Sequence, residues 1–163
     1  DLVLPKGSKQ EKAFIRLVVT FVTLVKSSCK SVKEVLKQAK NADDERSVFI
    51  IKNIFQPVYE HYINALSDSD QIDFTDAILQ ATEICRTSHP VEYDYIIVDE
   101  FQDISVDRYN FLKVLREGNP PAKLYCVGDD WQSIYRFSGS DMALFNQFPE
   151  YFVAKEINKI EST

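Results

Sequence analysis

The chain has 163 residues, of which 45% are hydrophobic and 27% are charged, and its net charge is −6. These values are typical of an ordinary soluble domain with one sizeable core, and they exclude a disordered chain. The most apolar stretch, residues 14–25, contains Arg16 and is shorter than the roughly 20 residues that a membrane span requires. We therefore expect no membrane partner, and the first ten residues do not resemble a signal peptide.

The cysteines and histidines give little indication of a metal site. Cys29, Cys85 and Cys126 are widely spaced and form no Cys-x-x-Cys pair, which argues against a disulfide framework and against zinc. A reducing cytoplasm is the expected location. His61 and His89 each stand alone, so we expect neither to have a direct function.

Charge is distributed unevenly along the chain. Residues 1–40 hold nine Lys or Arg against three Asp or Glu, which gives +6, so residues 41–163 carry −12. Five lysines recur at spacings of three and four, which would place them on one helical face: Lys26, Lys30, Lys33, Lys37 and Lys40. Such a face could follow nucleic-acid phosphates, or it could simply be solvated.

Residues 11–86 show a helical pattern of apolar positions, and we interpret this zone as a helical insertion. Ser31 and Glu34 predict a capping box, and Asp43-Asp44 predict another helix start. A long helix is expected through residues 49–63, followed by a loop at residues 67–70.

The next helix begins near Asp73 in the segment DFTDAILQATEIC. A carboxylate at this position suits a helix cap better than a functional group, although both are open.

The second zone follows the turn at His89-Pro90 and has an α/β pattern. Its expected elements are a strand at Tyr95–Val98, a helix at Val106–Arg116, a strand at Leu124–Val127 and a helix at residues 141–148 that Pro149 stops. The first three form a right-handed βαβ unit with parallel strands.

Acidic residues follow both predicted strands. Residues 94–103 are DYIIVDEFQD, and residues 124–141 are LYCVGDDWQSIYRFSGSD. Because ligands bind outside the carboxyl ends of strands in open α/β sheets, Asp99-Glu100 and Gly128-Asp129-Asp130 should line one crevice. This arrangement suits a metal-nucleotide site.

Phosphoryl transfer requires a divalent cation and a group that orients or deprotonates the attacking water. Asp99 can face the cation, while Glu100 can face the nucleophile as a general base. The simpler alternative is that the two acids begin a solvated loop.

The longer pattern favours the functional interpretation. VDEFQD followed by VGDDWQSIYRFSGSD resembles motifs II and III of the superfamily 1 DNA helicases of the UvrD/Rep type, closest to the DNA helicase IV branch. This resemblance implies an α/β fold, namely part of a RecA-like P-loop NTPase domain with parallel strands, preceded by a helical inserted subdomain. The expected domains are residues 1–72, a partial helical insertion, and residues 73–163, part of the first RecA-like ATPase domain.

The resemblance also implies site residues and ligands. Asp99 resembles the aspartate associated with Mg²⁺, Glu100 the glutamate that activates water, and Gln132 the glutamine that senses the terminal phosphate of ATP. Tyr135 and Phe137 occupy positions where the family places aromatic side chains against single-stranded DNA. ATP and Mg²⁺ are the expected cofactors. The expected partners are single-stranded DNA, duplex junctions and the remainder of the parent helicase chain.

The chain departs from the family pattern at two places. Phe137-Ser138-Gly139 stands where many relatives have Trp-Arg-Gly, so base stacking should be weaker. Trp131 stands where many relatives have an acid, and packing is a more ordinary role for its indole than nucleic-acid contact. Arg136 could serve a phosphate or pair with Asp141.

No phosphate-binding loop is present. The pattern G-x-x-x-x-G-K-[ST] occurs at none of the chain's glycines, which are Gly7, Gly118, Gly128 and Gly139. We therefore expect an internal fragment of an ATP-dependent DNA helicase that is inactive alone. A helicase-derived binding module is the alternative. A metal-dependent nuclease is weaker, because Glu100-Phe101-Gln102 lacks the usual acidic-x-Lys pairing.

Overall fold

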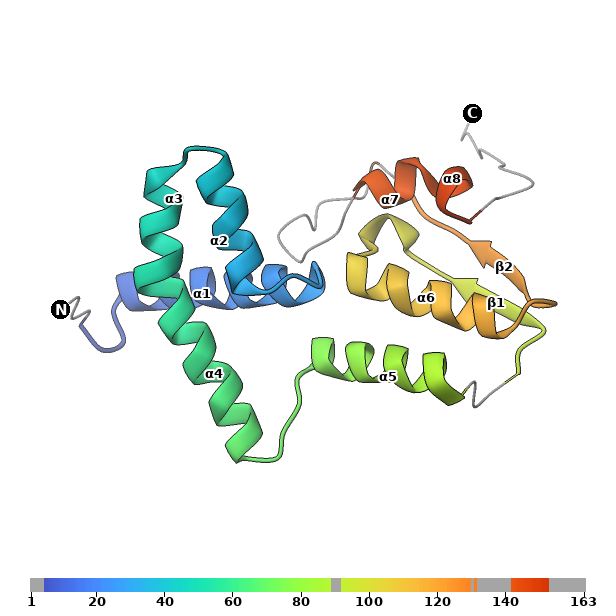
Figure 1. Cartoon of the computed structure of the whole chain (residues 1–163), viewed down its shortest axis with the longest axis horizontal. Coiled ribbons are helices and arrows are strands. Elements are labelled where there is room, and N and C mark those ends of the chain that lie inside the picture. Colours follow the sequence, from blue (N-terminus) through green and yellow to red (C-terminus); the bar gives the residue numbers. More distant parts are fainter. Residues whose placement is uncertain (1–4, 89–91, 130, 132–141, 153–163) are drawn as a thin grey trace. The chain divides into compact units, whose positions relative to one another are not determined.

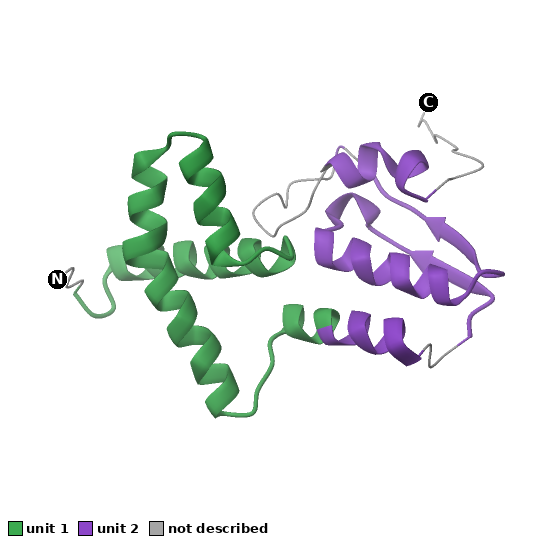
Figure 2. Cartoon of the chain, viewed as in Figure 1, with its two compact units in different colours: residues 1–79 green, residues 80–163 purple. Residues whose placement is uncertain are grey.

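The computed structural model describes residues 5–88, 92–129, 131 and 142–152. The chain divides into two compact units, residues 1–79 and 80–163 (Figure 2). The division falls inside a helix, whereas the sequence placed a domain boundary between residues 72 and 73.

Unit 1 is helical (Figure 1). Its elements are α1 (Lys9–Ser27), α2 (Val32–Asn41), α3 (Glu45–Ile50), the π-helix η1 (Ile51–Phe55), α4 (Gln56–Asp68) and the start of α5 (Phe74–Ser88). The predicted capping box is confirmed, since Ser31 and Glu34 bond each other's backbone at the start of α2. Asp44 caps α3 by accepting from the backbone of Ser47, as the sequence predicted for this helix start.

The long helix expected over residues 49–63 is interrupted by a π-helical turn. This turn, η1, ends two residues before Pro57, which lies in the first turn of α4. Proline has no N–H to donate to a preceding carbonyl and its ring clashes with an α-helical turn, so a wider turn accommodates it.

The core of unit 1 forms where α1, α2 and η1 meet. Its buried residues are Val25, Val32, Ile51 and Phe55. The ring of Phe21 stacks on that of Phe55 with centroids 4.3 Å apart. This cluster buries the apolar side of α2.

A buried lysine joins α1 to the start of α5. Lys26 Nζ lies 2.7 Å from Asp73 Oδ2 and 2.6 Å from Asp76 Oδ1, and the lysine side chain is only 5% exposed. The Tyr62 hydroxyl donates to Asp73 at 2.8 Å. Asp73 also accepts from the backbone N–H of Asp76 at 2.9 Å, so its expected capping role is confirmed.

The prediction that the five lysines share one helical face is wrong. α1 ends at Ser27 and α2 begins at Val32, so Lys26 and the lysines of α2 lie on different helices. Cys29 between them has a left-handed backbone, with φ of 54°, which breaks the helical spacing. Lys33 and Lys37 are exposed on α2, whereas Lys26 is buried and ion-paired.

Unit 2 contains the βαβ unit. Its elements are the end of α5, β1 (Tyr95–Val98), the 3₁₀-helix η2 (Phe101–Asp103), α6 (Val106–Gly118), β2 (Lys123–Cys126), α7 (Met142–Asn146) and α8 (Phe148–Phe152). β1 and β2 are parallel, with Tyr95 opposite Lys123 and Val98 opposite Cys126. The predicted β1 is confirmed, and β2 is shifted by one residue from the prediction.

The prediction that Pro149 stops the last helix is wrong. The structure has two short helices, and Pro149 lies in the first turn of α8. The first turn tolerates proline, because its N–H groups have no partner within the helix.

One face of the small sheet packs against the core of unit 2. Buried members of this core are Ile96, Phe101, Ile104, Leu112, Ala122, Leu144 and Phe152. The alternate positions of the strands are exposed, including Tyr95, Ile97 and Tyr125, and Ile97 is 72% exposed. The sheet is therefore covered on one face by the described residues, although parallel sheets are normally covered on both.

No helix among the described residues is long and apolar enough to cross a membrane.

Candidate functional site

The acidic residues that follow the two strands lie at the same edge of the sheet. Asp99 and Glu100 follow β1, and Gly128 and Asp129 follow β2 after one further residue. The parallel register places Val98 opposite Cys126, so the carboxyl ends of both strands are level. The structure thus brings together the described part of the predicted crevice.

Two backbone hydrogen bonds continue the pairing beyond the strands. Val127 N donates to the carbonyl of Val98 at 2.9 Å, and Phe101 N donates to the carbonyl of Val127 at 2.8 Å. The loop after β1 is therefore fixed to the loop after β2 by main-chain contacts, independently of the acidic side chains.

Glu100 adopts a left-handed backbone, with φ of 50° and ψ of 42°. This conformation costs on the order of 1–2 kcal/mol for a residue with a side chain. Glu100 N donates to Asp99 Oδ1 at 2.9 Å, which stabilises the turn. Both residues are exposed, so both carboxylates are accessible to a ligand.

Gln102 connects the two loops through its side chain. It is 1% exposed. Its Nε2 donates to Glu100 Oε2 at 2.5 Å, and its Oε1 accepts from Asp129 N at 2.9 Å. The sequence pattern contained this glutamine, but composition and spacing gave it no role.

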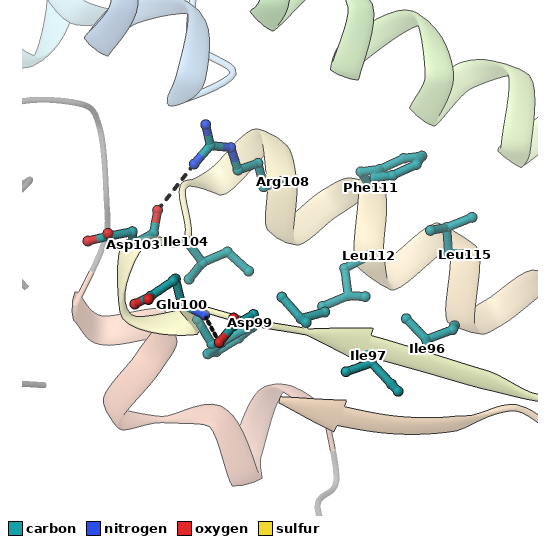
Figure 3. Close-up of a pocket in the computed structure, with 12 residues that line it drawn as sticks. Ile96, Ile97, Asp99, Glu100, Asp103, Ile104, Arg108, Phe111, Leu112 and Leu115 are labelled. Atoms are coloured by element: carbon teal, nitrogen blue, oxygen red, sulfur yellow. Dashed lines mark hydrogen bonds between the residues drawn. The ribbon is translucent and has the colours of Figure 1, made fainter. Parts of the chain in front are cut away.

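A hollow of about 300 Å³ lies between β1 and α6, beside the acidic turn. Figure 3 shows Asp99 and Glu100 at one end of it, and apolar side chains such as Ile96 and Leu112 along the rest. Arg108 Nη1 donates to the carbonyl of Asp103 at 3.5 Å, and it is the arginine among the lining residues. Asp103 Oδ1 is buried and has no hydrogen-bond partner among the described residues.

The donor set fits a magnesium ion held together with phosphates. Mg²⁺ prefers oxygen ligands, and at phosphate sites it is held by one or two carboxylates while phosphates and water complete its coordination. The exposed carboxylate of Asp99 suits this role. No group of three metal-binding side chains occurs in the described ranges, so these residues offer no all-protein cage.

Several predicted site residues lie outside the described residues. These are Asp130, Gln132, Tyr135, Arg136 and Phe137. Trp131 is described and is 92% exposed, so the described residues do not provide the packing expected for its indole. Its backbone N–H donates to Asp129 Oδ1 at 3.0 Å.

Comparison with known proteins agrees with the sequence motifs. The family pattern described as the UvrD/REP helicase N-terminal domain matches residues 5–153. DNA helicase IV of Escherichia coli is 39% identical over 111 residues, which cover 68% of this chain and 16% of that protein.

Two further relatives carry helicase names. ATP-dependent DNA helicase PcrA of Staphylococcus epidermidis is 34% identical over 134 residues, covering 78% of this chain and 18% of that protein. ATP-dependent DNA helicase Rep of Buchnera aphidicola is 32% identical over 111 residues, covering 62% and 17%. The chain thus spans less than a fifth of the length of these relatives. Because the family pattern extends over most of the chain, the chain belongs to the UvrD/REP helicase family.

Proposed function

We propose that this chain is part of an ATP-dependent DNA helicase that couples Mg-ATP hydrolysis to movement along single-stranded DNA and to unwinding of duplex junctions. The observation that carries the proposal is the sheet edge at which the segment with Asp99 and Glu100 is hydrogen-bonded to the segment with Gly128 and Asp129. The relatives named ATP-dependent DNA helicases support the same conclusion.

In this proposal the two adjacent carboxylates have separate tasks. Asp99 holds Mg²⁺, which neutralises phosphate charge when the nucleotide is bound. Glu100 accepts a proton from the attacking water, a role worth about 10²- to 10⁴-fold in rate. The exposure of Asp99 and Glu100 supports this division of labour, because each carboxylate is accessible to a separate group of the ligand.

The segment after β2 supplies the contacts to nucleotide and DNA. We assign Gln132 to the terminal phosphate, and Tyr135 and Phe137 to stacking on single-stranded bases. Gln132 and Tyr135 are three residues apart in the sequence, so one short segment can report the state of the phosphate to the DNA.

Residues 73–163 are proposed to form part of the first RecA-like ATPase domain, and residues 1–72 part of a helical insertion. The exposed apolar face of the sheet supports the first assignment. The described residues do not cover that face, which is formed by Tyr95, Ile97 and Tyr125. This exposure is expected if other segments of the full-length protein complete the domain. A phosphate-binding loop is expected in those segments.

The full-length protein tests this proposal. It should hydrolyse ATP in the presence of Mg²⁺, single-stranded DNA should stimulate the hydrolysis, and the protein should separate the strands of a partial duplex. Asp99→Ala is the matched control, because it removes the proposed magnesium ligand from an exposed position. DNA binding without hydrolysis by the unmodified protein would support the non-catalytic binding module instead.

A further inference from the structure

Gln102 is the most deeply buried large side chain among the described residues, yet it is polar. A buried amide is costly unless its hydrogen-bonding groups are satisfied. Both ends of this amide have partners, and the partners belong to different loops. The side chain therefore does more than fill space.

The two hydrogen bonds of Gln102 connect chemistry to backbone. Nε2 donates to the carboxylate of Glu100, while Oε1 accepts from the backbone N–H of Asp129. The donation occupies Oε2 of Glu100 and restricts rotation of its carboxylate. Because the acceptor end holds a main-chain group, the Glu100 carboxylate is tied to the backbone of the segment after β2.

The neighbouring glycine leaves space for this bridge. A Cβ atom at Gly128 would lie 2.6 Å from Gln102 Oε1 and 3.0 Å from Gln102 N. It would also lie 2.9 Å from Cε2 of Phe145. These distances are too short for non-bonded atoms, so any larger residue at this position would displace the amide.

We propose that Gln102 is a positioning residue that holds the Glu100 carboxylate and fixes it to the backbone at Asp129. A shift of the backbone at Asp129 is then transmitted to the water-activating carboxylate through one side chain. This inference rests on the proposed function, because it requires Glu100 to act as the base. A 1 Å misplacement of such a group can reduce the rate by about 10²-fold.

The test uses the full-length protein with the substitutions Gln102→Met and Gln102→Asn. Methionine keeps the length of the side chain but loses both hydrogen bonds. Asparagine keeps the amide but is one methylene too short to reach both partners. For each variant we expect kcat for ATP hydrolysis to fall by about 10²-fold, with KM for ATP changed by less than about threefold.

Gly128→Ala provides an independent route to the same defect. The added methyl group displaces Gln102 Oε1, so kcat should fall without any change to Gln102 itself. Combining Gly128→Ala with Gln102→Met should reduce kcat no further than the larger single effect, because both changes break the same bridge.

A purely structural role makes different predictions. Phe152→Leu is the matched control, since Phe152 is buried in the same core but has no atom among those nearest to the Gly128 Cβ position. It should lower the melting temperature while leaving kcat per folded molecule within about threefold of the unmodified protein. An equal loss of kcat in Phe152→Leu would overturn the positioning role.

Glu100→Gln, measured alongside, separates the two proposals. If Glu100→Gln is inactive while Gln102→Met and Gln102→Asn hydrolyse ATP at the normal rate, the positioning role is wrong and the proposed function stands. If Glu100→Gln hydrolyses ATP normally, the proposed function itself is wrong.

Discussion

Each unit contains a pair of acidic side chains, and the two pairs have opposite surroundings. In unit 1, Asp73 and Asp76 are paired with the buried Lys26. In unit 2, Asp99 and Glu100 are exposed, and among the described residues no lysine or arginine forms an ion pair with either. Charge that is neutralised within the chain supports folding, whereas charge left exposed at the ends of strands is available to a ligand cation.

The largest expected effect concerns what the exposed acids can do alone. The isolated chain should lack robust ATPase activity, because its sequence contains no G-x-x-x-x-G-K-[ST] loop. The backbone amides and the lysine of such a loop hold the β- and γ-phosphates, and Asp99 and Glu100 cannot replace them. The measurement is magnesium-dependent ATP hydrolysis by the purified chain. DNA-stimulated turnover that Glu100→Gln abolishes would contradict this prediction.

A smaller effect is expected where the proposed DNA contact begins. In the full-length protein, Tyr135→Ala should weaken binding to single-stranded DNA by about 1–3 kcal/mol per base lost from stacking, without changing base preference. DNA-stimulated ATPase should fall more than basal ATPase. A lower melting temperature with unchanged DNA affinity per folded molecule would instead indicate packing.

Gln132→Ala distinguishes the phosphate contact from the DNA contact. This variant should bind single-stranded DNA with near-normal affinity while hydrolysis becomes uncoupled from unwinding. DNA affinity, ATPase and unwinding rates measured on the same preparation provide the comparison. Equal losses of DNA affinity in Gln132→Ala and Tyr135→Ala would remove the distinction between the two residues.

Removing the ion pairs of Lys26 with Asp73 and Asp76 should lower the free energy of unfolding. Lys26→Met leaves two carboxylates without their partner, at a cost of about 1–3 kcal/mol because both are partly exposed to solvent. Lys37→Met is the matched control, since Lys37 is exposed on α2. Urea unfolding should show the loss only for Lys26→Met, and equal stability of the two variants would contradict the role of the ion pairs.

The same cluster should make stability depend on pH. Burial alone would raise the pKa of Asp73, but hydrogen bonds from Lys26, the Asp76 backbone and Tyr62 offset this, and the pKa lies below its ordinary value. Its contribution is therefore full above the ordinary Asp pKa of about 3.9 and is lost as pH falls through the folded-state pKa. Asp73→Asn should reduce the dependence of the free energy of unfolding on pH in the acid range, as measured by urea unfolding at a series of pH values.

At alkaline pH the same cluster should lose stability as pH rises. Burial alone would lower the pKa of Lys26, but Asp73 and Asp76 offset this and raise it. Burial and the Asp73 hydrogen bond raise the pKa of Tyr62 to about 12. Both contributions are present at neutral pH and are lost as pH rises above about 10 through the folded-state pKa values. Stability that is constant from pH 7 to about 12 would contradict this account.

The sequence predicted helices and strands correctly where residues close together in the sequence determine them. The strand Tyr95–Val98 is a short apolar run bounded by acids, and the capping box of Ser31 and Glu34 is a local contact, so both were predictable. Pro149 was misjudged, because a proline can begin a helix as well as end one.

Contacts between distant residues were not predictable from spacing. Lys26 and Asp73 are 47 positions apart in the sequence, so the spacing of the lysines could not predict their buried ion pair. The acidic edge of the sheet was predicted because acidic residues directly follow both apolar runs in the sequence. The bridge through Gln102 was not, because a glutamine after a strand is ordinarily solvated and its close approach to Gly128 joins segments that are distant in the sequence.

The most direct test of the exposed acidic edge is the comparison of Glu100→Gln with Asp99→Ala in the full-length protein. Mg-ATP binding and ATP hydrolysis should be measured on both variants at saturating single-stranded DNA. Glu100→Gln should reduce hydrolysis by about 10²- to 10⁴-fold while leaving Mg-ATP binding largely intact, and Asp99→Ala should weaken Mg-ATP binding. Near-normal hydrolysis by both variants at saturating ATP would contradict the assignment of this edge as the nucleotide site.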